Sequence, residues 1–197
     1  MSDVYNIEIH KILSENLTNF ELSKSYGHRA VGDKIESDCS NIVMKHFVNE
    51  YKPPTSKRSI EDFSLVTTDH HNLFDVKTHF IQDTIGFSMP NLISVKRLKK
   101  LLENDLQSLS YVFVDYTRDD LGVIIKDVTV KYIWELDWTI LSIGALGKGQ
   151  LQIKDANKQL KFTDIGKQKW FDILKVNVNS FYQKEMMKIK KEIGEWI

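Results

Sequence analysis

Cysteine, proline and glycine are scarce in this sequence, which has one, three and nine of them among 197 residues. The single cysteine, Cys39, can form no intramolecular disulfide, and a zinc site would need histidines and carboxylates for its other ligands. No apolar run is long enough to cross a bilayer, and residues 1–9 lack the hydrophobic core of a signal peptide. We therefore expect a soluble, cytoplasmic protein in a reducing compartment, with no membrane partner.

An excess of charge of either sign is also absent. Lys and Arg number 27, and Asp and Glu number 27, so the formal net charge is zero. This balance argues against a protein that coats nucleic acid with an overall basic surface, but it leaves room for a local basic groove. Basic residues form two clusters. Either cluster could be a surface that faces phosphates, although such a cluster is more commonly a solvated helix face. The clusters are Lys96, Arg97, Lys99 and Lys100, and Lys184, Lys188, Lys190 and Lys191.

Several catalytic signatures are missing. The chain has no Gly-x-Gly-x-x-Gly segment, no Walker phosphate loop and no nucleophile elbow. His70 and His71 are adjacent in a polar, turn-like segment, so their side chains diverge, and no cysteine lies nearby to complete a zinc site. Dinucleotide, nucleoside-triphosphate and serine- or cysteine-nucleophile chemistry therefore have no support.

Helical and strand-like patterns alternate along the chain. Apolar residues recur at three- and four-residue steps over residues 7–25, 30–49, 90–106 and 165–196, which predicts four helices, the last interrupted near residues 176–178. β-rich segments predict strands over residues 63–67, 73–80, 109–116, 123–136, 138–143 and 150–153. The length suits one domain over residues 1–197. We expect an α/β fold with a central mixed β-sheet flanked by helices.

Three charged residues meet in the first predicted hairpin. Asp62 begins one strand, and Asp75 and Lys77 follow on its partner after a turn at residues 68–72. Because side chains alternate along a strand, Asp75 and Lys77 share one face. Two carboxylates suit Mg²⁺, and the ammonium can orient a water or offset charge on a phosphate, as phosphodiester hydrolysis requires. The plainer interpretation is an exposed Asp–Lys ion pair.

Asp62, followed by Asp75-Val76-Lys77 across a hairpin, resembles the PD-(D/E)xK motif of type II restriction endonucleases and related nucleases. Glu61 stands where the family has a proline. The resemblance implies a restriction-endonuclease-like core and Mg²⁺ as cofactor. It also implies a metal site made of Asp62, Asp75 and the carbonyl of Val76, with Lys77 as the catalytic lysine.

The family also often has a glutamate on the helix before the hairpin. Glu36 occupies that place here, and the resemblance spans about residues 30–106 in the order helix, hairpin, helix. Glu36 is thus either a catalytic residue that supports the metal or a boundary residue with its tip in solvent. Asp69 competes with Asp62 for the first position of the motif, but it lies in the turn and should point to solvent.

A glycine-rich segment, residues 144–149, suggests where DNA would bind. In the EcoRV-like branch of the family a late loop after a strand enters the major groove. Glycine lets backbone approach DNA, and Lys and Gln donate to phosphates and base edges; the alternative is a plain turn with solvated polar residues. The candidate DNA contacts are Lys148, Gln150, Gln152 and Lys154 in and after this segment, with His79 and Lys96 elsewhere.

The resemblance implies a Mg²⁺-dependent, site-specific endonuclease of double-stranded DNA, a type II restriction enzyme. A homodimer is expected, because a symmetric site is matched by a symmetric protein, with the N-terminal and C-terminal helices as the dimer elements. Three alternatives stay open: a structure-specific or repair nuclease of the same superfamily, a non-catalytic DNA-binding or assembly protein with this fold, and a globular protein unrelated to DNA.

Overall fold

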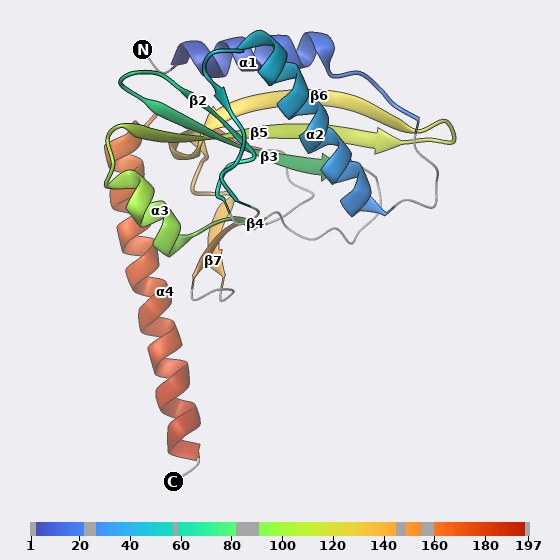
Figure 1. The fold of residues 1–197 in the computed structure, drawn as a ribbon. Coiled ribbons are helices and arrows are strands. Elements are labelled where there is room, and N and C mark those ends of the chain that lie inside the picture. The colour runs from blue at the N-terminus through green and yellow to red at the C-terminus, as the bar shows by residue number, and fades with distance from the viewer. Residues whose placement is uncertain are drawn as a thin grey trace.

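The computed structural model describes residues 3–21, 27–56, 59–81, 91–144, 149–154 and 160–195. Its centre is a five-stranded sheet with helices packed against both faces, and a long C-terminal helix extends away from the body (Figure 1). In spatial order, the strands are β1 (Tyr51–Lys52), β2 (Phe63–Val66), β3 (His71–Phe80), β5 (Gln107–Arg118) and β6 (Val123–Tyr132).

The sheet is mixed, as the sequence predicts. β3 and β5 run parallel over ten paired residues, whereas the pairs β1–β2, β2–β3 and β5–β6 are antiparallel. β5 is buried on both faces for most of its length, which fits a central strand beside a parallel neighbour.

Two helices cover the first face of the sheet, α1 (Asp3–Asn16) and α2 (His28–His46) (Figure 1). Their apolar stripes pack on the side chains of β3 and β5 that alternate toward them, such as Phe74, Val76 and Val112. Ile9 and Leu13 of α1 are fully buried there. Burial of such side chains stabilises the fold by roughly 1.5–3 kcal/mol each, so this layer holds α2 firmly against β3.

The opposite face packs against α3 (Val95–Leu102), the short 3-10 helix η1 (Ile133–Glu135) and the start of α4 (Lys167–Glu195). Leu73, Leu109 and Tyr111 of β3 and β5 point to this side. Trp170 anchors α4, because its indole is fully buried and its Nε1 donates a hydrogen bond to the Leu136 carbonyl at 2.8 Å.

A second, three-stranded antiparallel sheet lies beside this face, and the sequence analysis did not separate it from the first. Its order is β4 (Asn91–Ser94), β8 (Gln150–Ile153) and β7 (Leu141–Gly144). The helix expected over residues 90–106 is wrong at both ends, because the observed helix, α3, covers only residues 95–102. Residues 91–94 pair with β8 instead, and Ser94 caps α3 by accepting a hydrogen bond from the Arg97 amide; Pro90 lies outside the described residues.

Other element boundaries also differ from expectation. The first helix covers residues 3–16 rather than 7–25, and it is followed by Phe20, which makes an isolated bridge to Val123 of β6. The strand expected over residues 138–143 begins only at Leu141, because the Thr139 amide donates to the Asp137 carboxylate in a turn. α4 runs without interruption through residues 176–178. None of the described helices is both long and apolar enough to cross a membrane.

Candidate active site

The β2–β3 hairpin positions Asp62 against β3. The backbone N–H of Asp62 donates to the Phe74 carbonyl at 2.8 Å, one step before the first paired residues, Phe63 and Phe74. The Asp62 carboxylate in turn accepts a hydrogen bond from the Val76 N–H at 2.7 Å. Backbone hydrogen bonds therefore hold both the main chain and the side chain of Asp62. They keep its carboxylate close to Asp75 and Lys77, the two residues that flank Val76.

Asp75 and Lys77 share the face of β3 opposite to α1 and α2, as their alternation predicts. The Lys77 Nζ lies 2.6 Å from the Asp75 Oδ1, and the Asp75 side chain is only 8% exposed. The same ammonium lies 5.9 Å from the centre of the fully buried Tyr111 ring on the neighbouring strand. The pair is thus largely buried, which argues against the plainer interpretation of an exposed ion pair.

Asp62 lies next to Asp75, and this crowding of carboxylates has an electrostatic consequence. Burial raises the pKa of Asp75 to about 7, and the neighbouring Asp62 adds to the rise, whereas Lys77 opposes it. Two carboxylates at such close range repel each other when both are ionised. A divalent cation between them would relieve this repulsion, as would a proton.

Glu36 of α2 reaches the same group of acids from the other side. α2 approaches β3 closely at Gly32, where a Cβ would lie 3.2 Å from the Thr78 hydroxyl, and Glu36 follows one turn later. The Glu36 side chain keeps contact with solvent, but desolvation, followed by the charge of Asp62, raises its pKa to about 7. The tertiary structure thus places Glu36 beside Asp62, though not among the residues that line the adjoining cavity.

A cavity of about 300 Å³ opens beside the three residues of the motif. It is lined by the hairpin on one side and by β4, α3 and β8 on the other. The lining residues are Ser59, Ile60, Asp62, Asp75, Lys77, Leu92, Ile93, Ser94, Arg97 and Gln150. Gln150 is one of the candidate DNA contacts, and the structure brings it to the same cavity as Asp62, Asp75 and Lys77.

The remaining candidate DNA contacts lie elsewhere or are already engaged. The Gln152 amide donates to the Asn91 side chain at 2.5 Å, and the His79 ring lies 3.1 Å from the Asp115 carboxylate. Lys96 and Lys154 are exposed and do not line the cavity. Lys148 lies outside the described residues.

Arg97 is the residue that the sequence analysis passed over. Arg97 belongs to the first basic cluster, from which only Lys96 was predicted to contact DNA. In the structure Arg97, on α3, lines the cavity. The available signal was Ser94, a good helix N-cap, which would have set the start of α3 and hence the direction in which each basic residue points. Arg97 is suited to phosphate because its guanidinium offers several donors in a fixed plane.

The donor set fits a Mg²⁺ ion. Asp62 and Asp75 offer carboxylate oxygens, the ligands that this hard cation prefers. No group of three His, Cys, Asp or Glu side chains is gathered as ready-made metal ligands in the described part of the chain. Mg²⁺ is usually held by one or two carboxylates and keeps several waters or substrate oxygens, and Asp62 and Asp75 could supply two such carboxylates.

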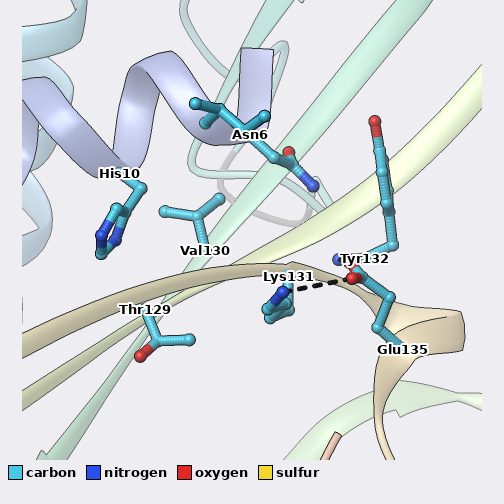
Figure 2. A pocket seen from close by; sticks show the side chains of 8 residues that line it. Asn6, His10, Thr129, Val130, Lys131, Tyr132 and Glu135 are labelled. Atoms are coloured by element: carbon cyan, nitrogen blue, oxygen red, sulfur yellow. Dashed lines mark hydrogen bonds and ion pairs between the residues drawn. The ribbon is translucent and has the colours of Figure 1, made fainter. Parts of the chain in front are cut away.

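A larger cavity, of about 370 Å³, lies between α1 and β6 and has different chemistry (Figure 2). Its only lining carboxylate, among residues that the structure describes, is Glu135, which pairs with Lys131 at 3.3 Å. The Asn6 side chain points into the space between α1 and β6, and its Oδ1 accepts a hydrogen bond from Ser110 at 2.8 Å. Without paired carboxylates, this cavity does not offer the metal chemistry of the first.

Comparison with known proteins supports the fold. No protein-family model matches the sequence, and no curated protein does. Among solved structures, the chain is similar to the NlaIV restriction endonuclease, with a TM-score of 0.52 and 20% identity over 80% of this chain and 70% of that one. The chain therefore has a restriction-endonuclease-like fold, and the fold expected from the motif is confirmed.

Proposed function

We propose that this protein is a Mg²⁺-dependent endonuclease that hydrolyses phosphodiester bonds of double-stranded DNA, with residues 1–197 acting as one nuclease domain. The observation that carries the proposal is the convergence of Asp62, Asp75 and Lys77 at one cavity, on a hairpin of a restriction-endonuclease-like fold. Fold alone does not imply function, so the argument depends on the two neighbouring carboxylates and the lysine, of which Asp75 is buried and Asp62 and Lys77 are partly exposed.

Each residue has a distinct role in this proposal. Asp62 and Asp75, with the Val76 carbonyl, hold the metal, and Glu36 supports it directly or through a water. Lys77, kept in place by Asp75 at 2.6 Å, orients the attacking water and offsets negative charge that develops on the phosphate. When bound, Mg²⁺ polarises the phosphoryl oxygen and lowers the pKa of the attacking water.

The opposite wall of the cavity suits a nucleic-acid backbone. Arg97 can donate two hydrogen bonds to one phosphate, and Gln150 can donate and accept at a base edge or a backbone oxygen. Gln150 begins β8 directly after Gly149, and the N–H of Val95 at the start of α3 donates to the Gly149 carbonyl at 2.9 Å. Recognition of a defined site, and a symmetric homodimer to match it, complete the proposal of a type II restriction enzyme in the cytoplasm.

The first test is digestion of plasmid and phage DNA by the wild-type protein, with Mg²⁺ and with EDTA. We expect discrete bands with Mg²⁺ and intact DNA with EDTA. A Mg²⁺-dependent smear would instead favour the structure-specific or repair nuclease. DNA binding without cleavage under any divalent metal would favour a non-catalytic DNA-binding protein, and no affinity even at low salt would exclude a DNA function.

Arg97→Ala is expected to weaken DNA binding by about tenfold and to lower the slope of log K against log salt by roughly 0.9, because one phosphate contact is lost. The measurement is a fluorescence-anisotropy titration at several salt concentrations, with Ca²⁺ in place of Mg²⁺. Lys99→Ala is the matched control, since this side chain is 70% exposed on the same helix and pairs with Glu103. Equal effects of the two substitutions would show that Arg97 makes no special contact.

A further inference from the structure

A buried amide on α1 lacks an acceptor for its N–H groups. Asn6 is only 7% exposed, and its Oδ1 accepts a hydrogen bond from the Ser110 hydroxyl of β5 at 2.8 Å. Its Nδ2 is buried as well, yet no residue that the structure describes accepts a hydrogen bond from it. A buried donor without an acceptor destabilises a folded protein, so the presence of Asn6 at this position needs an explanation.

The place of Asn6 on α1 calls for an apolar side chain. Asn6 lies about one turn before Ile9, on the face of α1 that packs on the sheet, where Ile9 and Leu13 are fully buried. An apolar residue at this position would pack on the same core and leave no polar group without a partner. Packing within the described chain therefore does not account for the amide, and a bound molecule would.

Asn6 lines the cavity of about 370 Å³ between α1 and the edge strand β6 (Figure 2). This volume falls within the range of small-molecule sites and far exceeds the share of one water, which is about 30 Å³ in the liquid. Ile7 and Val130 supply apolar wall, and the cavity can be entered from solvent because Ile7 and His10 are exposed. The cavity therefore has the size and the access that a small ligand requires.

The hydrogen-bonding capacity that the cavity leaves to a ligand is mainly that of donors. Glu135 uses both of its oxygens, Oε1 with the Lys131 Nζ at 3.3 Å and Oε2 with the Tyr132 N–H at 2.8 Å. The Lys131 ammonium has three N–H donors, and Glu135 accepts from one of them. Asn6 on α1 and Lys131 on β6 thus offer donors from opposite sides of the space (Figure 2). A ligand that satisfies them must supply acceptor oxygens.

We propose that the cavity between α1 and β6 binds a small organic anion. The carboxylate or phosphate oxygens of this anion accept hydrogen bonds from the Asn6 Nδ2 and the Lys131 Nζ, and its apolar body lies along Ile7 and Val130. An anionic acceptor is favoured over a neutral one, because hydrogen bonds between an ammonium and an anionic oxygen are stronger than bonds between neutral groups. Carboxylates and phosphates share this chemistry, and the experiment below distinguishes them.

This anion site is separate from the candidate active site. The two cavities share no lining residue among those that the structure describes. Ser110, which donates to Asn6, and Tyr111, whose ring lies beside Lys77, are consecutive in β5, so their side chains point to opposite faces of the sheet. The inference therefore does not rest on the proposed function, and DNA and the anion would not compete for one cavity.

The test is an NMR titration of the ¹⁵N-labelled full chain, without DNA or metal, with benzoate, phenyl phosphate and benzyl alcohol, which share a ring and differ in the polar group. We expect a saturable shift of the Asn6 side-chain NH₂ resonance with at least one anion, at a Kd on the order of 1 mM, and binding of benzyl alcohol at least about tenfold weaker. The tighter anion identifies the ligand as a carboxylate or a phosphate. No saturable shift with either anion, or equally tight binding of benzyl alcohol, would overturn the proposal.

Two variants test the donors. Asn6→Leu replaces the amide by an apolar side chain, and Lys131→Met removes the ammonium but keeps the stem. Each should raise the Kd of the tighter anion by at least about tenfold, as the loss of a hydrogen bond to a charged group does. Lys126→Met is the matched control, because Lys126 is an exposed residue of β6 outside the cavity, and it should leave the Kd within about twofold. If Asn6→Leu does not fold, Lys131→Met alone decides. An unchanged Kd in a folded variant, or an equal rise in Lys126→Met, would refute the site, whatever the cleavage assays show.

Discussion

Asp75→Asn is expected to lower Mg²⁺-dependent DNA cleavage by at least about 1000-fold. The substitution keeps the size of the side chain but removes a carboxylate that ligates the metal in our proposal. Loss of several kcal/mol of transition-state stabilisation by a bound metal corresponds to this factor, since about 4 kcal/mol equals roughly 1000-fold in rate. The measurement is a single-turnover cleavage rate at saturating enzyme.

The controls separate chemistry from folding and from binding. Asp69→Asn changes an exposed carboxylate in the turn of the same hairpin and should leave the rate within about twofold. Lys77→Met should lower the rate by about 100-fold or more, because the positive charge beside the phosphate is lost while the buried stem is kept. DNA affinity in Ca²⁺ should survive Lys77→Met. If Asp75→Asn and Asp69→Asn cleave equally well, the chemistry lies elsewhere in the molecule.

The second large effect is a loss of stability of the metal-free protein as the pH rises. Asp75 has a pKa of about 7 in the folded state and about 4 in an unfolded chain, so the folded state binds its proton more tightly. The free energy of unfolding therefore falls as the pH rises from about 4 to about 7, and then levels off. The size is about 2–4 kcal/mol, or roughly 5–10 °C in Tm.

Thermal unfolding in EDTA at pH 5 and pH 8 measures this effect, with Asp75→Asn as the comparison. The variant lacks the titrating carboxyl, so its Tm should fall less between the two pH values than that of the wild type. The difference between the two proteins reports the titration of Asp75 together with its electrostatic interaction with Asp62, because all other titrating groups are present in both. An identical pH dependence in both would mean that Asp75 is not held in the crowded environment described above.

Mg²⁺ should restore the stability that is lost at pH 8. A ligand at about 100 times its Kd stabilises the folded state by about 2.7 kcal/mol. The wild type should gain Tm with Mg²⁺ at pH 8 and gain less at pH 5, because a proton competes with the metal for the same carboxyls. Asp75→Asn should gain little at either pH. A wild-type Tm that does not respond to Mg²⁺ at pH 8 would argue against a metal site between Asp62 and Asp75.

The sequence pattern was most informative where the physics is local. Alternation along β3 was enough to predict that Asp75 and Lys77 share a face and that Phe74 and Val76 point the other way, because side chains on a strand alternate whatever lies around them. The polar turn and the β-rich flanks were enough to predict the β2–β3 hairpin. The predicted helices were wrong mainly at their ends, because capping residues set where a helix begins and ends. Ser94 caps the start of α3 four residues after Pro90, where the helix was expected to begin.

The sequence by itself determined the mixed α/β architecture, the hairpin and the shared face of Asp75 and Lys77, because these follow from periodicity and strand geometry. Only the tertiary structure decided that Glu36 meets Asp62, and that Arg97 and Gln150, rather than Lys96 and Lys154, line the cavity. Those contacts join residues that are far apart in the chain. Their relative positions depend on how α2 packs on β3 and how β4 pairs with β8, and no local pattern encodes that packing.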